Sequence, residues 1–200
     1  MIGIVSYGCG NIASLMNMIR KIGGESILCE NPEDLKKVDK ILLPGVGAFD
    51  YAMQALKSRG WIDELNNAIL DEQKKILGIC LGMQLLCKSS DEGIEKGLGF
   101  LDAEVKKFKV DSKLKIPHMG WNIVRSTKKN SLIDVSIEQR FYFVHSFFVD
   151  CMNQEDVLAE TQYGQAFTSA VKKNNIYGVQ FHPEKSHKFG MALLTGFKNL

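Results

Sequence analysis

The stretch LGICLGMQ at residues 77–84 decides how this chain folds. It continues an apolar run that begins at Ile76, and it places Gly78 two residues before Cys80 and Gly82 two residues after it. This spacing is typical of a nucleophile elbow, a strained turn between a strand and a helix that leaves no room for side chains at the two glycines. The turn sets the thiol at a helix N-terminus, where the helix dipole favours a thiolate. Cysteine is also often simply buried, so packing alone is the alternative explanation.

Short apolar runs alternate with amphipathic segments on the N-terminal side of this stretch. Strands separated by helices form right-handed crossovers and a mostly parallel sheet that helices cover on both faces. We expect strands at residues 2–5, 26–29, 41–43 and 76–79, and helices over residues 12–22, 49–56 and 61–69.

The second half of the chain is richer in β-type segments, and some of its strands should be antiparallel. These segments lie at residues 104–108, 141–149, 157–160, 170–172 and 176–181, before a closing helix at residues 191–198. The predicted fold class is therefore α/β: a three-layer, open, mostly parallel sheet with helices on both faces, with additional antiparallel strands in the second half. Because no repeat or linker divides the chain, we expect a single domain over residues 1–200.

Composition excludes several classes of protein. The chain has 200 residues, with 25 Lys and Arg against 23 Asp and Glu, and its formal net charge of +2 is not gathered into a basic block that would indicate nucleic-acid binding. The uncharged first 19 residues include Ser6 and Asn11, which argues against a secretory leader or a membrane span. Five cysteines without a C-x-x-C pair argue against a disulfide framework. We expect a cytoplasmic protein.

A nucleophilic cysteine needs a base and an orienting group, and one histidine stands out for these roles. His182 follows an apolar strand within YGVQFHPE at residues 177–184, with Glu184 two residues later. The order Cys80, His182, Glu184 predicts a nucleophile, a general base and its orienter. His145 ends an apolar strand, whereas His118 is expected to be structural or partner-facing, as is His187. A His-x-Glu pair without a third ligand does not indicate a metal site, so we expect none.

Acyl transfer also needs amide donors beside the nucleophile, and the loop PGVGAF at residues 44–49 follows the third predicted strand. Its glycines allow a peptide to turn its amide inward, and the amide of Leu81 is the second candidate donor. The loop is also a plausible helix-entry turn without a catalytic role.

A second glycine motif, GCGNIA at residues 8–13, matches the dinucleotide-binding pattern G-x-G-x-x-A. Glu30, after the next strand, would then contact a ribose hydroxyl. A glycine turn between strand and helix is also common for steric reasons alone, and the chain is short for a dehydrogenase. We therefore expect no cofactor.

Five motifs follow one another along the chain: PGVGAF, GICLGMQ, IPHMGWN, FYFVHSF and GVQFHPEKS. Together they resemble the class I (triad) glutamine amidotransferases, whose fold is flavodoxin-like. The third and last motifs resemble the glutaminase subunits of imidazole glycerol phosphate synthase. The resemblance extends from Ile2 to the C-terminus.

The resemblance implies that Cys80 attacks the γ-amide of glutamine, while His182 and Glu184 complete the triad. It also implies a set of supporting residues. These are Val46, Gly47 and Leu81 for the oxyanion hole, Gln84, Glu92, His145 and Ser146 for glutamine binding, and Asn11, Pro117, Met119, Trp121, Tyr142 and Lys185 for the partner interface. In the family, ammonia passes to a (β/α)8 cyclase subunit, which forms imidazole glycerol phosphate and aminoimidazole carboxamide ribotide in histidine biosynthesis.

Two positions depart from the family pattern. Ser6 stands where an Asp is usual, and Phe147 replaces a common Tyr. Related subunits supply ammonia to enzymes that amidate sugars for surface polysaccharides or glycans, and this pathway is the alternative assignment. A peptidase-like triad hydrolase is a further alternative, against which Gln84 and the His145–Ser146 segment favour glutamine.

Overall fold

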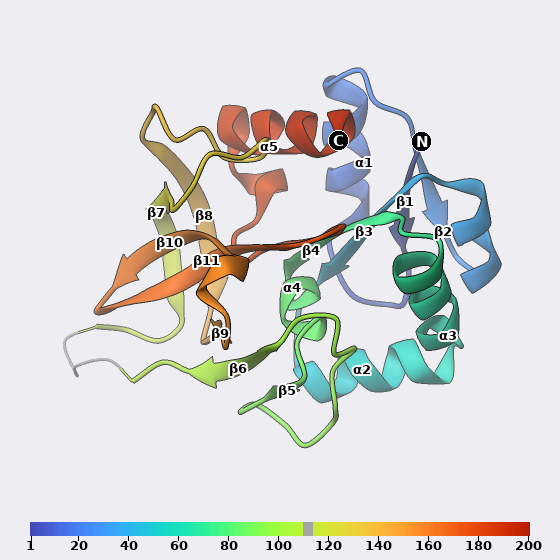
Figure 1. The fold of residues 1–200 in the computed structure, drawn as a ribbon, viewed down its shortest axis with the longest axis horizontal. Coiled ribbons are helices and arrows are strands. Elements are labelled where there is room, and N and C mark those ends of the chain that lie inside the picture. The colour runs from blue at the N-terminus through green and yellow to red at the C-terminus, as the bar shows by residue number, and fades with distance from the viewer. Residues whose placement is uncertain (110–113) are drawn as a thin grey trace.

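Five parallel strands form one half of a large mixed sheet (Figure 1). The computed structural model describes residues 1–109 and 114–200. The parallel strands lie in the order β2 (Ser26–Cys29), β1 (Ile2–Val5), β3 (Lys40–Gly45), β4 (Lys75–Cys80) and β12 (Ile176–Val179). β4 and β12 therefore lie side by side although about a hundred residues separate them. This pairing brings the end of the GICLG strand next to the strand that leads to His182.

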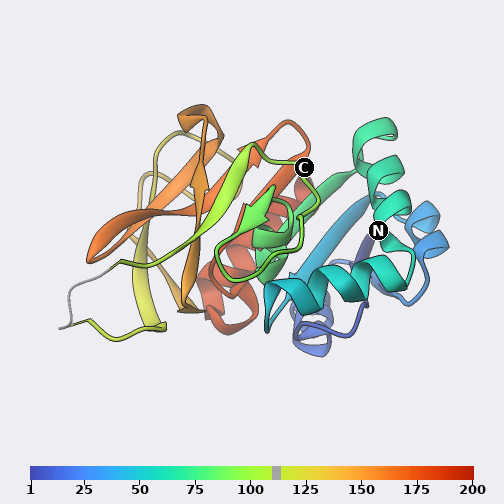
Figure 2. The same cartoon turned by 90° about the horizontal axis from the view of Figure 1, so that it is seen from below.

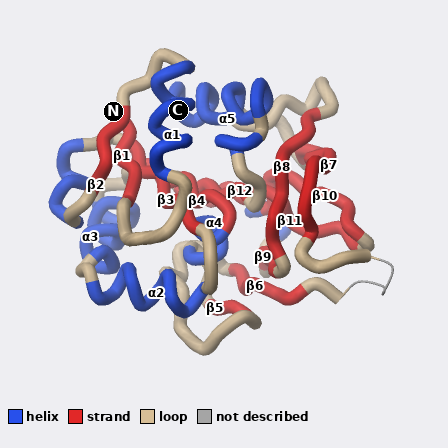
Figure 3. The backbone as a smooth tube through the Cα atoms, turned by 180° about the vertical axis from the view of Figure 1, so that it is seen from behind, coloured by secondary structure: helices blue, strands red, loops and turns tan. Residues whose placement is uncertain are grey.

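Helices cover both faces of the parallel half, as the sequence predicts. Figure 3 shows α1 (Ile12–Lys21) and α5 (His187–Asn199) together on one side of the strands. On the other side lie α2 (Phe49–Ser58), α3 (Trp61–Asn66) and the short α4 (Leu81–Leu85). Short helical turns complete the set: η1 (Pro32–Lys37), η2 (Asn67–Asp71), η3 (Gln154–Asp156) and η4 (Pro183–Lys185). Within the described residues, no helix is both long and apolar enough to span a membrane.

The antiparallel half continues the same sheet beyond β12 (Figure 2). Its main strands are β11 (Gln165–Lys173), β10 (Val157–Tyr163), β7 (His118–Ser126) and β8 (Gln139–His145). A side branch consists of β9 (Phe147–Cys151), β6 (Ala103–Lys107) and β5 (Ser89–Ser90). The α/β fold prediction, with antiparallel strands in the second half, is confirmed.

Two details of the sequence prediction were wrong. The segment at residues 141–149 is two strands, because the pairing with β7 ends with β8, and after Ser146 β9 pairs with β6 and β11 instead. β7 was not predicted at all. Its sequence, HMGWNIVRS, includes a glycine at φ 128°, and its apolar Met119 and Trp121 are exposed whereas the polar His118 is buried, which is the reverse of the usual half-buried strand.

Apart from the edge strand β2, the strands of the parallel half are buried on both faces, which explains their continuous apolar runs. Successive side chains of a strand point to opposite faces. In β3, Ile41 and Leu43 pack with the α2 and α3 side chains, whereas Leu42 packs with those of α1 and α5. Ile76 and Leu77 of β4 divide between the two cores in the same way. Each core is closed only when helices cover its face.

This packing is very tight where α4 crosses β3. A Cβ built on Gly82 would lie 1.8 Å from the carbonyl oxygen of Leu43, and one on Gly78 would lie 2.6 Å from the carbonyl oxygen of Gly82. Because backbone atoms cannot yield as a flexible side chain does, both positions require glycine. These are the two glycines that the elbow spacing singles out.

We predict that Gly82→Ala lowers the free energy of unfolding by about 3 kcal/mol or more, since the methyl group forces α4 away from β3. Gly23→Ala is the comparison variant, because Gly23 has open space around its Cβ position and only its left-handed φ of 65° opposes a side chain. It should cost about 1 kcal/mol. Urea denaturation measures both, and equal losses would contradict the steric explanation.

Candidate active site

Cys80 stands at the end of β4 in a backbone conformation that L-residues rarely adopt. Its φ is 55° and its ψ is −113°, and α4 begins at the next residue. This is the geometry of a nucleophile elbow, in which strain projects the side chain away from the sheet. The sulfur lies 4.0 Å from the carbonyl oxygen of Val144, which belongs to β8. The thiol is therefore held at the carboxyl edge of the sheet, where α/β proteins bind ligands.

His182 and Glu184 lie in the turn that follows β12. The Nδ1 atom of His182 is 2.8 Å from Oε1 of Glu184, and the two side chains are only 3% and 2% exposed. The backbone N–H of His182 donates to the carbonyl oxygen of Tyr142 at 2.9 Å, and the Ser186 hydroxyl donates to the His182 carbonyl at 2.6 Å. The turn is thereby fixed to both β8 and the start of α5.

The charge state of His182 follows from these neighbours. Burial by itself lowers the pKa of an imidazole, but the Cys80 sulfur and the Glu184 carboxylate outweigh it and raise the pKa of His182 to about 9. A proton on His182 is therefore favoured at neutral pH. Its Nε2 atom and Oε2 of Glu184 are buried without a hydrogen-bond partner among the described residues. The imidazole thus keeps one nitrogen available for chemistry.

A cavity of about 340 Å³ opens in front of Cys80. This volume is suitable for a small metabolite. The cavity brings together nine of the ten residues that the sequence singles out for catalysis, the oxyanion hole and glutamine binding: His182 and eight others. They are Val46, Gly47, Cys80, Leu81, Gln84, Glu92, His145 and Ser146. Pro117, Val144 and Phe147 also line it, and no role for the last two in the cavity was predicted from the sequence. Glu184 reaches the cavity only through His182.

The candidate oxyanion loop is held at both ends and open in its middle. The Tyr7 hydroxyl, which is fully buried, donates to the carbonyl oxygen of Pro44 at 2.7 Å. A Cβ on Gly45 would meet that hydroxyl at 2.8 Å, whereas Gly47, at φ 103°, has open space. At the end of the loop, the Phe49 N–H donates to Oε2 of Glu92 at 3.0 Å. Glu92 therefore connects the cavity wall to the first turn of α2.

His145 forms a buried pair with His118, which the sequence did not predict. Nδ1 of His145 lies 2.8 Å from the carbonyl oxygen of Phe147, which can only accept, so Nδ1 carries the proton. Nε2 of His145 then accepts from Nδ1 of His118 at 2.9 Å. Nε2 of His118 accepts from the Asn122 amide at 3.2 Å. All four ring nitrogens are thus used with both rings neutral.

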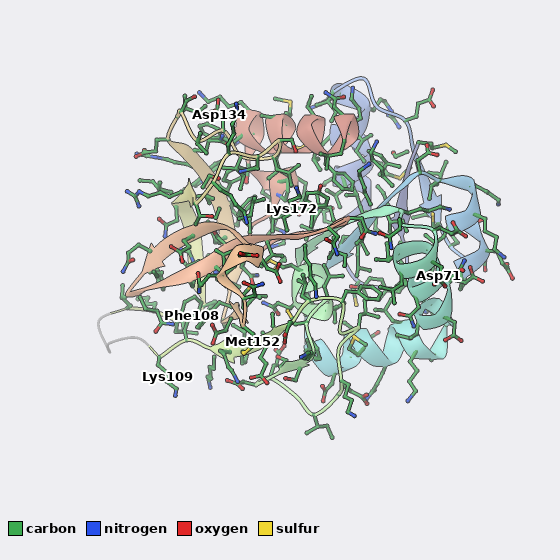
Figure 4. The ribbon with its side chains drawn as sticks, in the orientation of Figure 1. Asp71, Phe108, Lys109, Asp134, Met152 and Lys172 are labelled. Carbon is green, nitrogen blue, oxygen red and sulfur yellow. The ribbon has the colours of Figure 1, made fainter. Side chains whose placement is uncertain are left out.

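The surroundings keep this pair neutral. Burial lowers the pKa of His145 to about 3 and that of His118 to about 4. Aromatic rings enclose both imidazoles: Phe108, labelled in Figure 4 at the end of β6, lies 5.2 Å from the His145 ring between centroids, and Tyr163 stacks on His118 at 4.0 Å. His145 therefore serves as a fixed hydrogen-bonding wall of the cavity.

Most of the residues singled out for a partner interface gather beside the cavity mouth. Trp121 and Tyr142 are 6.3 Å apart between ring centroids, Lys185 places its Nζ 5.5 Å above the Tyr142 ring, and His187 stacks on Trp121 at 5.5 Å. Met119 is 62% exposed and Trp121 is 47% exposed, so two large apolar side chains lie next to each other on this face of β7. Pro117 lines the cavity itself. Asn11 is exposed at the start of α1, a helix that packs against η4.

The glycine turn at residues 8–13 has a packing explanation. A Cβ on Gly10 would lie 2.8 Å from Cβ of Pro44, so the turn must approach the candidate oxyanion loop closely. The guanidinium group of Arg59 covers Gly8, 3.5 Å from its Cβ position.

Among the described residues, no group of three or more potential ligands could hold a metal ion. All five cysteines are free and buried.

Comparisons with known proteins agree with this geometry. The sequence model of the family "Glutamine amidotransferase class-I" matches residues 4–198. The chain is 56% identical to "Imidazole glycerol phosphate synthase subunit HisH 2" of Methanococcus maripaludis, with 98% of each chain covered. It is 43% identical to the protein of the same name from Pseudomonas aeruginosa, with 100% of each covered. The structure of PurLQS from Thermotoga maritima superposes with a TM-score of 0.77 at 18% identity, covering 99% of this chain and 97% of that one, which is a likeness of fold alone.

We predict that the neutral histidine pair makes the fold sensitive to acid. Unfolded histidines bind protons below about pH 6.5, whereas the folded pair does so only near its lowered pKa values of about 4 and about 3. The contribution of this pair to the free energy of unfolding is therefore fully present above about pH 6.5 and is lost as the pH falls toward 4.

His118→Gln keeps a donor for His145 but removes one titrating ring. It should reduce the loss of unfolding free energy between about pH 7.5 and about pH 4.5 by about 2 kcal/mol. Urea denaturation of both proteins across this range tests the prediction. Parallel pH dependences in the two proteins would show that His118 is not held neutral.

Proposed function

The chain belongs to the class I glutamine amidotransferase family, and on this premise we propose that it is the glutaminase subunit of an imidazole glycerol phosphate synthase. It hydrolyses glutamine to glutamate and ammonia, and the ammonia serves histidine biosynthesis. The single observation that carries the proposal is the convergence of Cys80, at φ 55°, and the His182–Glu184 pair on one cavity. A thiol at an elbow beside a histidine that is oriented by a carboxylate is the arrangement of a cysteine-dependent acyl-transfer enzyme.

The reaction begins when the Cys80 thiolate attacks the γ-carbonyl carbon of glutamine. A carbon–sulfur bond forms, and the carbonyl electrons move onto the oxygen. His182 gives its proton to the departing nitrogen, the carbon–nitrogen bond breaks, and ammonia leaves behind a γ-glutamyl thioester. Water then attacks the thioester and gives its proton to His182, and the carbon–sulfur bond breaks to release glutamate. Glu184 holds the imidazole and stabilises its positive charge in both halves of the cycle.

The oxyanion that forms in both halves needs donors close to the sulfur. The backbone amide of Leu81 directly follows the nucleophile, and Val46 and Gly47 lie across the cavity. We assign these three residues to the oxyanion hole. The open space around Gly47 allows the peptide between Val46 and Gly47 to turn its N–H toward the cavity.

The substrate's other end needs polar groups at a fixed distance from Cys80. Gln84, Glu92, His145 and Ser146 line the cavity and are assigned to glutamine binding. Glu92 adds a carboxylate that suits the α-ammonium group of an amino acid. These groups favour free glutamine over a peptide, because a peptide bond would carry no ammonium there.

Ammonia needs an acceptor site, and we assign that site to a partner subunit of cyclase type with a (β/α)8 barrel. The exposed Met119 and Trp121, together with Pro117, Tyr142, Lys185 and Asn11, form the proposed interface. Ammonia released at the cavity mouth would then enter the partner and not the solvent. The complex works in the cytoplasm, which agrees with five free cysteines. A sugar-amidating partner is the alternative, and identification of the co-purifying cyclase-type protein distinguishes the two.

We predict that Cys80→Ala abolishes glutamine hydrolysis, with a loss on the order of 10⁴-fold or more, since no other group can form the thioester. Release of glutamate and ammonia by the assembled synthase is the measurement. Cys151→Ala is the matched control, because Cys151 is buried in β9, outside the residues that line the cavity. Full hydrolysis by the Cys80 variant would refute the proposed nucleophile.

We also predict that Trp121→Ala weakens binding of the cyclase subunit about thirtyfold, as expected for a large aromatic residue at the centre of an interface. Ile137→Ala is the control, because Ile137 is 55% exposed but precedes β8 at the end remote from His145. Titration calorimetry with the purified cyclase subunit compares the two variants. Equal affinities would place the interface elsewhere on the chain.

A further inference from the structure

Gln180 is a fully buried polar residue that the mechanism above does not use. It follows β12 and precedes His182 by two positions, and its side chain is 0% exposed. Its amide nitrogen Nε2 lies 3.7 Å from the sulfur of Cys80, and its Oε1 accepts from Nε2 of Gln84 at 2.9 Å. A buried amide is costly unless its donors and acceptors are satisfied, so its place beside the nucleophile requires an explanation.

The orientation of the Gln180 amide is set by a chain of hydrogen bonds. The chain starts at the carbonyl oxygen of Phe147, which can only accept. Nε2 of Gln84 therefore faces it, at 3.2 Å, and the same nitrogen uses its second proton toward Gln180. Gln180 must present its oxygen to Gln84 to accept this proton. Its own N–H group is consequently turned toward Cys80.

The starting carbonyl is itself fixed by a second donor. Phe147 accepts from Nδ1 of His145 at 2.8 Å as well as from Gln84. Both lone pairs of this oxygen are then occupied, which prevents the Gln84 amide from turning over. The direction of the N–H at the sulfur is therefore a consequence of the cavity wall and not a free choice of the Gln180 side chain.

A neutral thiol and a thiolate need different neighbours. A thiol can donate to the carbonyl oxygen of Val144, 4.0 Å away, whereas a thiolate only accepts. Among the described residues, the Gln180 side chain presents an N–H donor to this sulfur, at 3.7 Å. Hydrogen bonds to charged groups are stronger than those between neutral groups. The contact therefore favours the charged form of Cys80.

We propose that Gln180 is a further catalytic residue, whose amide N–H donates to the Cys80 thiolate and raises its population before glutamine is attacked. The bond is weakened when the sulfur becomes part of the uncharged thioester and is restored when glutamate leaves. This inference rests on the proposed function of Cys80 as the nucleophile. No oxidant, reductant or further ligand takes part.

The test replaces Gln180 by apolar side chains, Gln180→Leu and Gln180→Met, in the full-length protein. Alkylation of Cys80 by iodoacetamide is followed across a range of pH, with mass spectrometry of the peptide that contains Cys80. We expect the pH of half-maximal alkylation to rise by about one unit in both variants, which is about a tenfold slower reaction at neutral pH. The methionine variant keeps the length of the side chain in case the leucine variant folds poorly.

A matched control makes the same changes at another buried glutamine. Gln139 is 3% exposed at the start of β8, and its amide donates to the carbonyl oxygen of Asp134 at 3.3 Å, outside the residues that line the cavity. Gln139→Leu and Gln139→Met should leave the alkylation profile of Cys80 unchanged. Thermal unfolding of all four variants measures any general loss of stability separately.

Glutamine hydrolysis by the assembled synthase gives the second readout. In the Gln180 variants, kcat/KM should fall about tenfold near pH 7 and recover at alkaline pH, where the thiolate forms without help. A loss that is equal at every pH, or alkylation profiles that coincide with that of the unchanged protein, would overturn the proposal. Alkylation reports on Gln180 independently of turnover, so failure of the Cys80→Ala test would not be confused with failure of this one.

Discussion

The close crossing of α4 over β3 is the constraint on which the rest of the molecule depends. The Gly82 backbone packs so tightly on Leu43 that a Cβ would lie 1.8 Å from its carbonyl oxygen, and the chain between β4 and α4 must turn within one residue. Cys80 is that residue, which is why it adopts φ 55°. The cost of this strain is offset by the apolar side chains that are buried in the two cores, one on either side of the sheet. The reactive geometry is thus maintained by packing far from the sulfur.

The same site keeps two histidines in opposite charge states. His182 has its pKa raised to about 9, although it is buried, because its partners are a carboxylate and a sulfur. His145 has its pKa lowered to about 3, because its burial within an aromatic shell outweighs the hydrogen bond to the Phe147 carbonyl group, which by itself raises the pKa. The positive charge of His182 itself contributes to the lowered pKa of His145. Positive charge is therefore confined to the side of the sulfur where a proton must be transferred, and the opposite wall stays neutral.

The sequence predicted the parts of this molecule that depend on local patterns. The elbow glycines, the apolar runs of the parallel half and the His182–Glu184 turn are all short-range signals, and their positions in the fold follow from strand order. Contacts between distant segments were not predictable. His118 pairs with His145 only because β7 lies beside β8. β7 itself was missed, since its apolar Met119 and Trp121 lie on the exposed face and its polar His118 is buried, the reverse of a usual half-buried strand. Gln180 gave only the weak signal of a polar residue after a buried strand.

The negative charge of the proposed reaction occupies two places in turn, and the structure treats them differently. The sulfur is surrounded by rigid groups: Gln180 is fixed by Gln84, and His182 is fixed by Glu184. The proposed oxyanion site is rigid only in part, because Tyr7 fixes Pro44 and crowds Gly45, whereas Val46 is 46% exposed and Gly47 has open space. Freedom to adjust is therefore concentrated in one peptide at the cavity mouth. Since donors that point at developing charge contribute most when they are already in place, the orientation of this peptide decides how far an otherwise assembled site stabilises its transition state.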